Sequence, residues 1–215
     1  MATEITGGRQ DGKSFNPKRL WEEFLKGDGT AFGKIFKFYY QDLYGYGLKF
    51  CQKPDMVKDC IQEVFANIGE SRRRLGKVES VKAYLIVTLR RTLLKRLERR
   101  RTQETKMDEH VQRKSFQLSP EDIIIHEEID QEQRHALKEA LQTLPSRQKE
   151  VLFLRYFNGM SYNEIEQILS INYQSIRNHV YRATKRLKNI LDKNDALQRL
   201  YLSETTASEL KSGGM

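Results

Sequence analysis

The side chains with the most specific chemistry lie near the C-terminus, in two helices predicted from the spacing of their apolar residues. A helix of about nine residues opens with the capping box Ser161–Glu164, and a longer basic helix follows Asn172 after a three-residue turn. The second helix turns an apolar stripe inward between Ile176 and Leu187. Its outward side chains are Tyr173, Gln174, Ser175, Arg177, Asn178, Tyr181 and Arg182.

This outward set suits duplex DNA, because Gln, Asn and Arg can hydrogen-bond to base edges in the major groove. Lys185, Arg186 and Lys188 continue the basic face, where phosphate contacts are expected. The spacing therefore favours a DNA-binding helix-turn-helix. A solvated amphipathic helix in a helical hairpin is the alternative, and Ser170 stands where such turns often carry Gly.

A second basic surface is predicted on a helix from about residue 81 to 101, whose leucines recur every four residues. Cations follow a phosphate backbone, and Tyr84 among them could stack on an unpaired base. Single-stranded nucleic acid is one partner that fits; a solvated basic face is the other interpretation. The outward cations are Lys82, Arg90, Arg91, Lys95, Arg96, Arg99, Arg100 and Arg101, and the preceding loop adds Arg72, Arg73 and Arg74.

A small acidic patch is predicted on the preceding helix. Asp59, Gln62 and Glu63 stand at positions i, i+3 and i+4, opposite the apolar stripe of that helix. On a basic protein this patch favours a protein partner over DNA, with an ordinary solvated helix face as the alternative.

Signals for an enzyme are weak. The run Gly27–Gly33 is preceded by no strand and followed by no Gly-Lys-Ser/Thr, so it indicates a turn and a helix start. The four histidines have no metal-ligand spacing, and Cys51 and Cys60 fall near apolar stripes, where core packing is expected. Because no nucleophile has a base beside it, we expect no enzyme, no metal site and no cofactor.

The composition agrees with a nucleic-acid-binding class. The 215 residues carry 38 Lys and Arg against 29 Asp and Glu, a formal charge of +9, which points to a polyanionic partner. With 38% hydrophobic and 31% charged residues, small helical domains are favoured over one large core. No stretch reaches the length of a membrane span and the N-terminus has no signal peptide, so we expect a cytoplasmic protein without membrane insertion.

The elements that position these residues are all helical, since no segment alternates with the period of a strand. In the second domain, Ser146 is expected to cap a helix after Pro145, and Asn158-Gly159 to end it. We predict an all-α chain of two small helical domains on a flexible linker. The expected segments are a flexible extension (1–17), a helical bundle (18–101), a linker (102–118), a helix-turn-helix domain (119–193) and a polar tail (194–215).

Two motifs resemble those of bacterial RNA polymerase sigma factors. The stretch 54–65 contains Asp59, Gln62, Glu63, Val64 and Phe65 in the family's D-x-x-Q-E-V-F signature. The stretches 144–151 (LPSRQKEV) and 154–165 (LRYFNGMSYNEI) look like the opening of the promoter-binding region 4. With regions 2 and 4 alone, over about 20–101 and 130–191, the chain is similar to the extracytoplasmic-function (ECF) group.

The resemblance implies a role for each surface. Asp59, Gln62 and Glu63, here called the docking residues, would bind the β′ clamp helices of core polymerase, and core polymerase would also contact the chain through its β subunit. An anti-sigma protein would restrain activity. The minus-ten residues, which would melt and capture the non-template strand, are Arg72, Arg73, Arg74, Ser80, Lys82, Tyr84, Arg90, Arg91 and Lys95. The minus-thirty-five residues, which would read duplex DNA, are Tyr173, Gln174, Ser175, Arg177, Asn178 and Arg182.

The chain departs from the family pattern at several positions. The family usually has Trp near Ile68 and at Tyr84, and often Asn and Asp at Arg91 and Lys95; its recognition helix often starts with small residues, where this chain has Tyr173 and Gln174. The departures at Arg91 and Lys95 bear on the minus-ten sequence preference, and those at Tyr173 and Gln174 imply a distinctive minus-thirty-five sequence. Two other classes remain to be tested: a stand-alone helix-turn-helix regulator that needs no polymerase, and a nucleic-acid enzyme.

Overall fold

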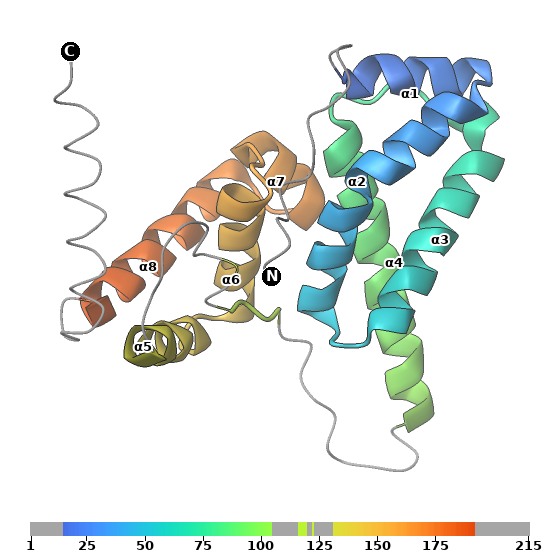
Figure 1. Cartoon of the computed structure of the whole chain (residues 1–215). Coiled ribbons are helices and arrows are strands. Elements are labelled where there is room, and N and C mark those ends of the chain that lie inside the picture. The colour runs from blue at the N-terminus through green and yellow to red at the C-terminus, as the bar shows by residue number, and fades with distance from the viewer. Residues whose placement is uncertain (1–14, 105–115, 120–121, 123–130, 192–215) are drawn as a thin grey trace, which may run out of the picture.

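The computed structural model describes residues 15–104, 116–119, 122 and 131–191, and this part of the chain contains helices and no strand. The prediction of an all-α protein is confirmed for these residues. The helices form two bundles that lie side by side (Figure 1), here called the first half, α1–α4, and the second half, α5–α8. Their bounds are α1 Pro17–Lys26, α2 Gly29–Phe50, α3 Pro54–Glu70, α4 Val81–Glu104, α5 Gln131–Gln142, α6 Ser146–Leu152, α7 Tyr162–Leu169 and α8 Tyr173–Leu191, with a 3-10 turn Arg72–Arg74 and a π-helical turn Phe153–Phe157.

The glycine-rich run between α1 and α2 is a turn and a helix start, as its residues predict. Gly27 ends α1 with a left-handed φ of 114°, a conformation that a residue with a Cβ rarely adopts. The Asp28 carboxylate then accepts the backbone N–H groups of Thr30 and Ala31 at 2.7 and 3.1 Å. These two hydrogen bonds lower the pKa of Asp28, so the cap is charged at neutral pH.

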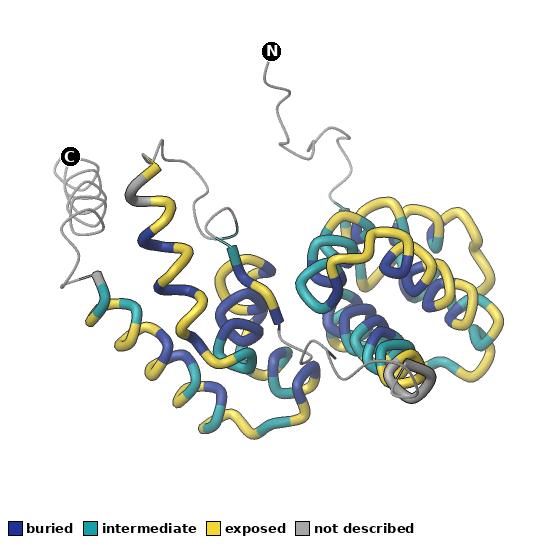
Figure 2. The backbone as a smooth tube through the Cα atoms, turned by 90° about the horizontal axis from the view of Figure 1, so that it is seen from below, coloured by how far each residue is buried: buried dark blue, intermediate teal, exposed yellow. Residues whose placement is uncertain are grey.

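The apolar stripes predicted from the sequence build the core of the first half. Leu85, Leu89 and Leu93 of α4 are fully buried, as their four-residue spacing requires. Cys51 and Cys60 are buried too, and burial raises the pKa of both thiols, so they pack as apolar groups. In Figure 2 the buried positions of each half face its own interior, while exposed positions follow the outer sides of the helices.

One close approach in this core depends on a glycine. A Cβ on Gly47 of α2 would lie 2.5 Å from Val57 Cγ1 of α3, closer than two carbons can approach. Gly47→Ala should therefore lower the free energy of unfolding by about 1–3 kcal/mol through overpacking. Gly45, two positions earlier on the same helix, has open space around it, and Gly45→Ala should raise that free energy by about 0.5–1 kcal/mol. Urea denaturation of both variants measures this difference, and equal effects would contradict the packing described here.

The caps of the second half follow the sequence prediction closely. Gly159 has a left-handed φ of 66° and ends the preceding helix. Ser161 Oγ accepts the backbone N–H of Glu164, and the Glu164 carboxylate accepts the N–H of Ser161, which completes the predicted capping box. Asn172 Oδ1 accepts the N–H of Ser175 at 2.7 Å and starts α8. Local chemistry therefore fixes where α7 and α8 begin.

One local prediction for the second half was wrong. Ser146 is not a cap but the first residue of α6, and its hydroxyl accepts the backbone N–H of Phe116 at 2.7 Å. The helix that begins there continues as the π-helical turn, in which the Asn158 N–H donates to the Phe153 carbonyl at 3.0 Å. Ser146 is thus used for a tertiary contact that its neighbours in sequence do not reveal.

The two halves contact each other directly, with α4 packed against α7. Residues 116–118, assigned to the linker in the sequence analysis, lie in this contact. The ring of Phe116 is fully buried between Tyr46 of the first half and Phe153 of the second. The Gln117 N–H donates to the Lys49 carbonyl at 2.8 Å. This end of the linker is therefore part of the packed structure.

Candidate nucleic-acid and protein interfaces

The predicted docking residues Asp59, Gln62 and Glu63 are all exposed on one face of α3. Arg96 of α4 bridges the two acids, with its guanidinium 3.5 Å from Asp59 Oδ2 and 3.7 Å from Glu63 Oε2. The side chain of Asp59 is 62% exposed, so solvent screens this bridge and the carboxylate stays accessible. The three residues form one continuous polar face that a protein partner can reach.

The three arginines of the loop after α3 form the 3-10 turn. Arg73 and Arg74 are exposed, whereas Arg72 is half-buried. The Arg72 guanidinium lies against the turn after α1, where it donates to the Leu25 carbonyl at 3.5 Å. Arg72 thus anchors the loop to the bundle, and Arg73 and Arg74 are left to meet a polyanion.

The remaining minus-ten residues lie on or just before α4, in different surroundings. Arg91 and Lys95 are exposed, as predicted. Ser80 starts the helix, since its Oγ accepts the Ala83 N–H at 3.2 Å. Tyr84 is half-buried, and its ring packs in a T-shaped arrangement with Trp21, with the ring centroids 5.3 Å apart. Part of the Tyr84 ring is therefore already used in packing.

Lys82 and Arg90 correct the prediction that every basic side chain of this helix faces solvent. Lys82 Nζ donates to the Asn158 carbonyl at 2.9 Å and pairs with Asp42 at 2.7 Å. Arg90 pairs with Glu150 at 2.8 Å, and its side chain is only 17% exposed. The prediction failed here because the second half covers this stretch of α4, which the periodicity of α4 alone cannot show.

The minus-thirty-five residues lie together on α8, above the apolar stripe that the sequence predicts. Ile176, Val180 and Ala183 are buried, and Ser175 is half-buried. Five of the predicted side chains are exposed: Tyr173, Gln174, Arg177, Asn178 and Arg182. Burial, with the nearby charges of Arg147 and Arg182, lowers the pKa of His179, which is consequently neutral at neutral pH. The exposed set can present amide and guanidinium groups to a groove of DNA.

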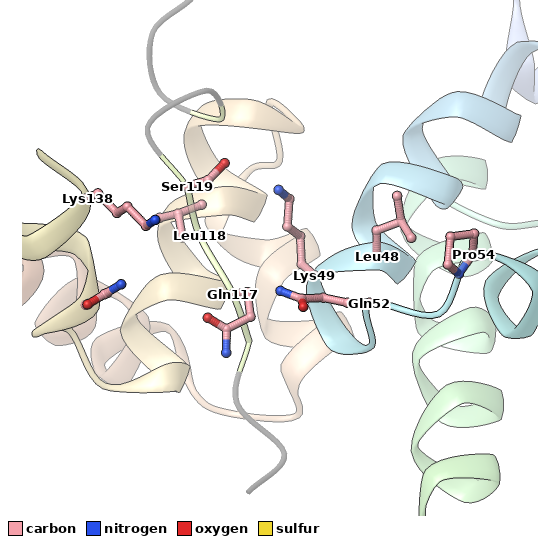
Figure 3. A pocket seen from close by; sticks show the side chains of 9 residues that line it. Leu48, Lys49, Gln52, Pro54, Gln117, Leu118, Ser119 and Lys138 are labelled. Atoms are coloured by element: carbon pink, nitrogen blue, oxygen red, sulfur yellow. The ribbon is translucent and has the colours of Figure 1, made fainter. Parts of the chain in front are cut away.

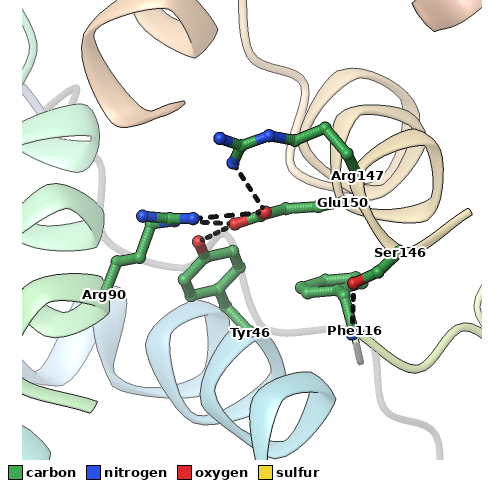
Figure 4. A network of polar contacts seen from close by, with 6 residues as sticks. All are labelled: Tyr46, Arg90, Phe116, Ser146, Arg147 and Glu150. Carbon is green, nitrogen blue, oxygen red and sulfur yellow. Dashed lines mark hydrogen bonds and ion pairs between the residues drawn. The ribbon is translucent and has the colours of Figure 1, made fainter. Parts of the chain in front are cut away.

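A buried ionic cluster joins the halves, and the sequence analysis missed it (Figure 4). Glu150 of α6 accepts hydrogen bonds from the Tyr46 hydroxyl at 2.9 Å, Arg90 Nε at 2.8 Å and Arg147 Nη1 at 3.3 Å. Burial and the Glu150 charge raise the pKa of Tyr46 well above its usual range. Burial opposes the charge on Arg90, but the bonds to Glu150 outweigh it and raise the Arg90 pKa. Glu150 therefore sits between two permanent cations.

A cleft of about 540 Å³ opens beside this contact (Figure 3). Leu48, Lys49 and Pro54 line it from the first half, and Leu118 and Lys138 line it opposite them. Lys49 is itself paired with Asp122. Asp122 also accepts the hydroxyl of Ser119, another residue that lines the cleft, at 2.9 Å.

No group of three or more His, Cys, Asp or Glu side chains in the described part of the chain could hold a metal ion. No helix within it has the length and apolar character needed to span a membrane.

Two family profiles match the chain. The profile "Sigma-70 region 2" matches residues 35–103, which include the docking and minus-ten residues. The profile "Sigma-70, region 4" matches residues 134–187, which include the minus-thirty-five residues. The two matched stretches together make up more than half of the chain.

Curated relatives include sigma factors, and solved structures share the fold. The chain is 25% identical to the RNA polymerase sigma factor SigV of Bacillus subtilis over 72% of its length and 87% of the relative's, and 21% identical to the ECF sigma factor SigK of Mycobacterium tuberculosis over 77% and 88%. Its fold is similar to CnrH in complex with the cytosolic domain of CnrY (17% identity, 84% of this chain, 100% of that chain, TM-score 0.56). It is also similar to the sigma factor RpoE in complex with the anti-sigma factor NepR from Bartonella quintana (22%, 75%, 96%, TM-score 0.57). The chain belongs to the ECF group of bacterial RNA polymerase sigma factors.

Proposed function

We propose that this sigma factor divides promoter opening among three helical surfaces. The docking residues on α3 bind the β′ clamp helices of core polymerase. The minus-ten residues melt and capture the non-template strand, and α8 reads the minus-thirty-five element as duplex. The observation that supports this division is chemical: exposed acids lie on α3, exposed cations on the 72–74 turn and α4, and exposed Gln, Asn and Arg on α8.

Melting in this proposal needs no catalysis by the chain. Bases that leave the stack are captured by protein contacts, which offset a few kcal/mol of lost stacking per step. Neither half needs tight affinity for DNA alone, because polymerase and the linker hold both near one promoter and raise their effective concentration. The chain thus acts as an initiation factor in the cytoplasm, without nucleotide hydrolysis.

An anti-sigma protein is a further proposed partner. Two solved structures with a similar fold each contain a second protein: CnrH is in complex with the cytosolic domain of CnrY, and the sigma factor RpoE is in complex with the anti-sigma factor NepR. We propose that this chain is restrained in the same manner, by a protein that binds its polymerase-docking or promoter-binding surfaces.

Run-off transcription tests the function directly. Sigma-free bacterial core polymerase is incubated with and without the chain on genomic fragments, including the region upstream of its own gene. Discrete new start sites are expected, and their alignment supplies both promoter elements. A stand-alone regulator would instead give no new transcripts and would not co-elute with core polymerase, although it would still bind duplex DNA.

The two exposed loop arginines should matter for melting more than for recruitment. Arg73→Ala with Arg74→Ala should reduce open-complex formation about tenfold, because two phosphate contacts to the captured strand are lost. Permanganate reactivity of unpaired thymines on a promoter found by run-off transcription measures this step. Lys34→Ala with Lys37→Ala, which removes two exposed cations from α2, is the matched control and should leave opening unchanged. Equal losses of open-complex formation in both variants would show that the effect comes from net charge alone.

A further inference from the structure

The contact between the halves is centred on Glu150, a single buried carboxylate. Its side chain is 4% exposed, and two of its three partners, Tyr46 and Arg90, belong to the other half. The three donors around the carboxylate are one hydroxyl and two guanidinium groups, and Glu150 keeps all three only while the halves touch. Separation of the halves would leave Arg147 as its partner from the same helix.

The same contact occupies residues assigned above to the minus-ten element. Lys82 donates to the Asn158 carbonyl, and Arg90 is paired with Glu150. Burial raises the pKa of the Glu164 carboxyl, but hydrogen bonds from Ser80 and Ser161 outweigh it and leave that pKa lowered. Ser80, Lys82 and Arg90 are thus engaged by groups of the second half, and a DNA strand would compete for them.

Promoter geometry requires the halves to separate. The minus-ten and minus-thirty-five elements are centred about 25 base pairs apart, or roughly 85 Å along B-DNA. Two halves that share one buried carboxylate cannot lie over both elements. The chain between Glu104 and Gln131 can reach roughly 90 Å when fully extended, so the covalent connection permits separation once Phe116 and its neighbours leave the interface.

We propose that the Tyr46–Arg90–Glu150 cluster is an autoinhibitory latch that holds the second half over the minus-ten cations until polymerase and promoter select the open form. The assignment of Lys82, Arg90 and Ser80 to the minus-ten element rests on the proposed function; the closed contact itself does not. A buried ion pair suits such a latch, because the desolvation of its charges offsets much of their attraction and keeps the closure reversible.

Distance measurements between the halves test the closure in the full-length chain. Spin labels are placed at Gln41→Cys on α2 and Asn163→Cys on α7, two exposed positions in the helices beside the contact, while the native cysteines are buried. The unaltered latch should give a short, narrow distance distribution. Glu150→Gln should raise the ratio of open to closed molecules by about a hundredfold or more, because it leaves Arg90 and Arg147 without their counter-charge.

Two further variants make the result specific. Tyr46→Phe removes one hydroxyl, keeps the ring, and should shift the same ratio in the same direction by about fivefold. Glu139→Gln removes a carboxylate that is 70% exposed on α5, and should leave the distances unchanged. Far-ultraviolet circular dichroism checks that all three variants keep their helices. Unchanged distances in both latch variants would overturn the proposal.

Binding of a fluorescent single-stranded DNA of mixed sequence tests the inhibitory consequence. Opening should increase the apparent affinity of Glu150→Gln about tenfold or more, since the binding-competent fraction rises. Open molecules without that gain would overturn the inhibitory role and count against the minus-ten assignment. Failure of the unmodified chain in run-off transcription would count against the proposed function alone, because the distance measurement involves neither polymerase nor DNA.

Discussion

Removal of the acids on α3 should abolish recruitment to core polymerase. Asp59→Ala with Glu63→Ala is expected to weaken binding to core polymerase by a hundredfold or more and to eliminate run-off transcripts. Loss of one partner from a hydrogen-bonded charge pair at an interface costs about 2–5 kcal/mol, and this variant removes two such groups. Both carboxylates are exposed and one helical turn apart, so a single partner surface can engage them together.

A matched control separates this effect from the general loss of negative charge. Glu79→Ala with Glu139→Ala also removes two exposed carboxylates, one just before α4 and one on α5, both outside α3. Fluorescence-anisotropy titration with core polymerase measures both double variants, and this control should bind normally. Full affinity in the Asp59 and Glu63 variant would instead remove α3 from the proposed interface.

A variant of Arg96 tests whether the acids themselves carry the contact with polymerase. It bridges Asp59 and Glu63 from α4, so the double variant also leaves an arginine without these partners. Arg96→Ala alone should weaken polymerase binding by less than fivefold, because the bridge is exposed and contributes little. A large loss in Arg96→Ala would show that the arginine, and not the acids, carries the contact.

The elements that the sequence predicted well are those determined by neighbouring residues. The capping box Ser161–Glu164, the Asn172 cap and the left-handed Gly159 each involve groups within three or four positions of one another. The buried leucines of α4 follow a period set by the helix itself. Such features can be predicted without knowing which distant residues pack against the helix.

The features that the sequence did not reveal depend on contacts between distant segments. Tyr46 and Glu150 are 104 positions apart, and Arg90 and Glu150 are 60 apart. No helical period links them, and Arg90 alone has the pattern of a solvated basic residue. Phe116 stands in a polar stretch, where one aromatic gives no periodic signal. Only the packing of the two halves shows that Phe116 belongs to the hydrophobic core.

The recognition helix should give the second large effect. Arg177 is exposed on α8 beside Asn178, one turn from the helix start, where a side chain can reach base edges in the major groove. Arg177→Ala should weaken binding of the holoenzyme to its own promoter about 5- to 150-fold, the worth of one bidentate contact to a base pair. It should also relax sequence preference at one position of the minus-thirty-five element.

Arg186→Ala provides the comparison that makes this loss interpretable. Arg186 is an exposed arginine two to three turns further along the same helix, where phosphate contact is expected. Its removal should weaken binding to all promoter variants alike and reduce the salt dependence, because a phosphate contact carries no base information. Titration of both variants against a set of single-base promoter changes distinguishes the two roles. A uniform loss for Arg177→Ala would make Arg177 a second phosphate contact, and sequence reading would then have to come from Gln174 and Asn178.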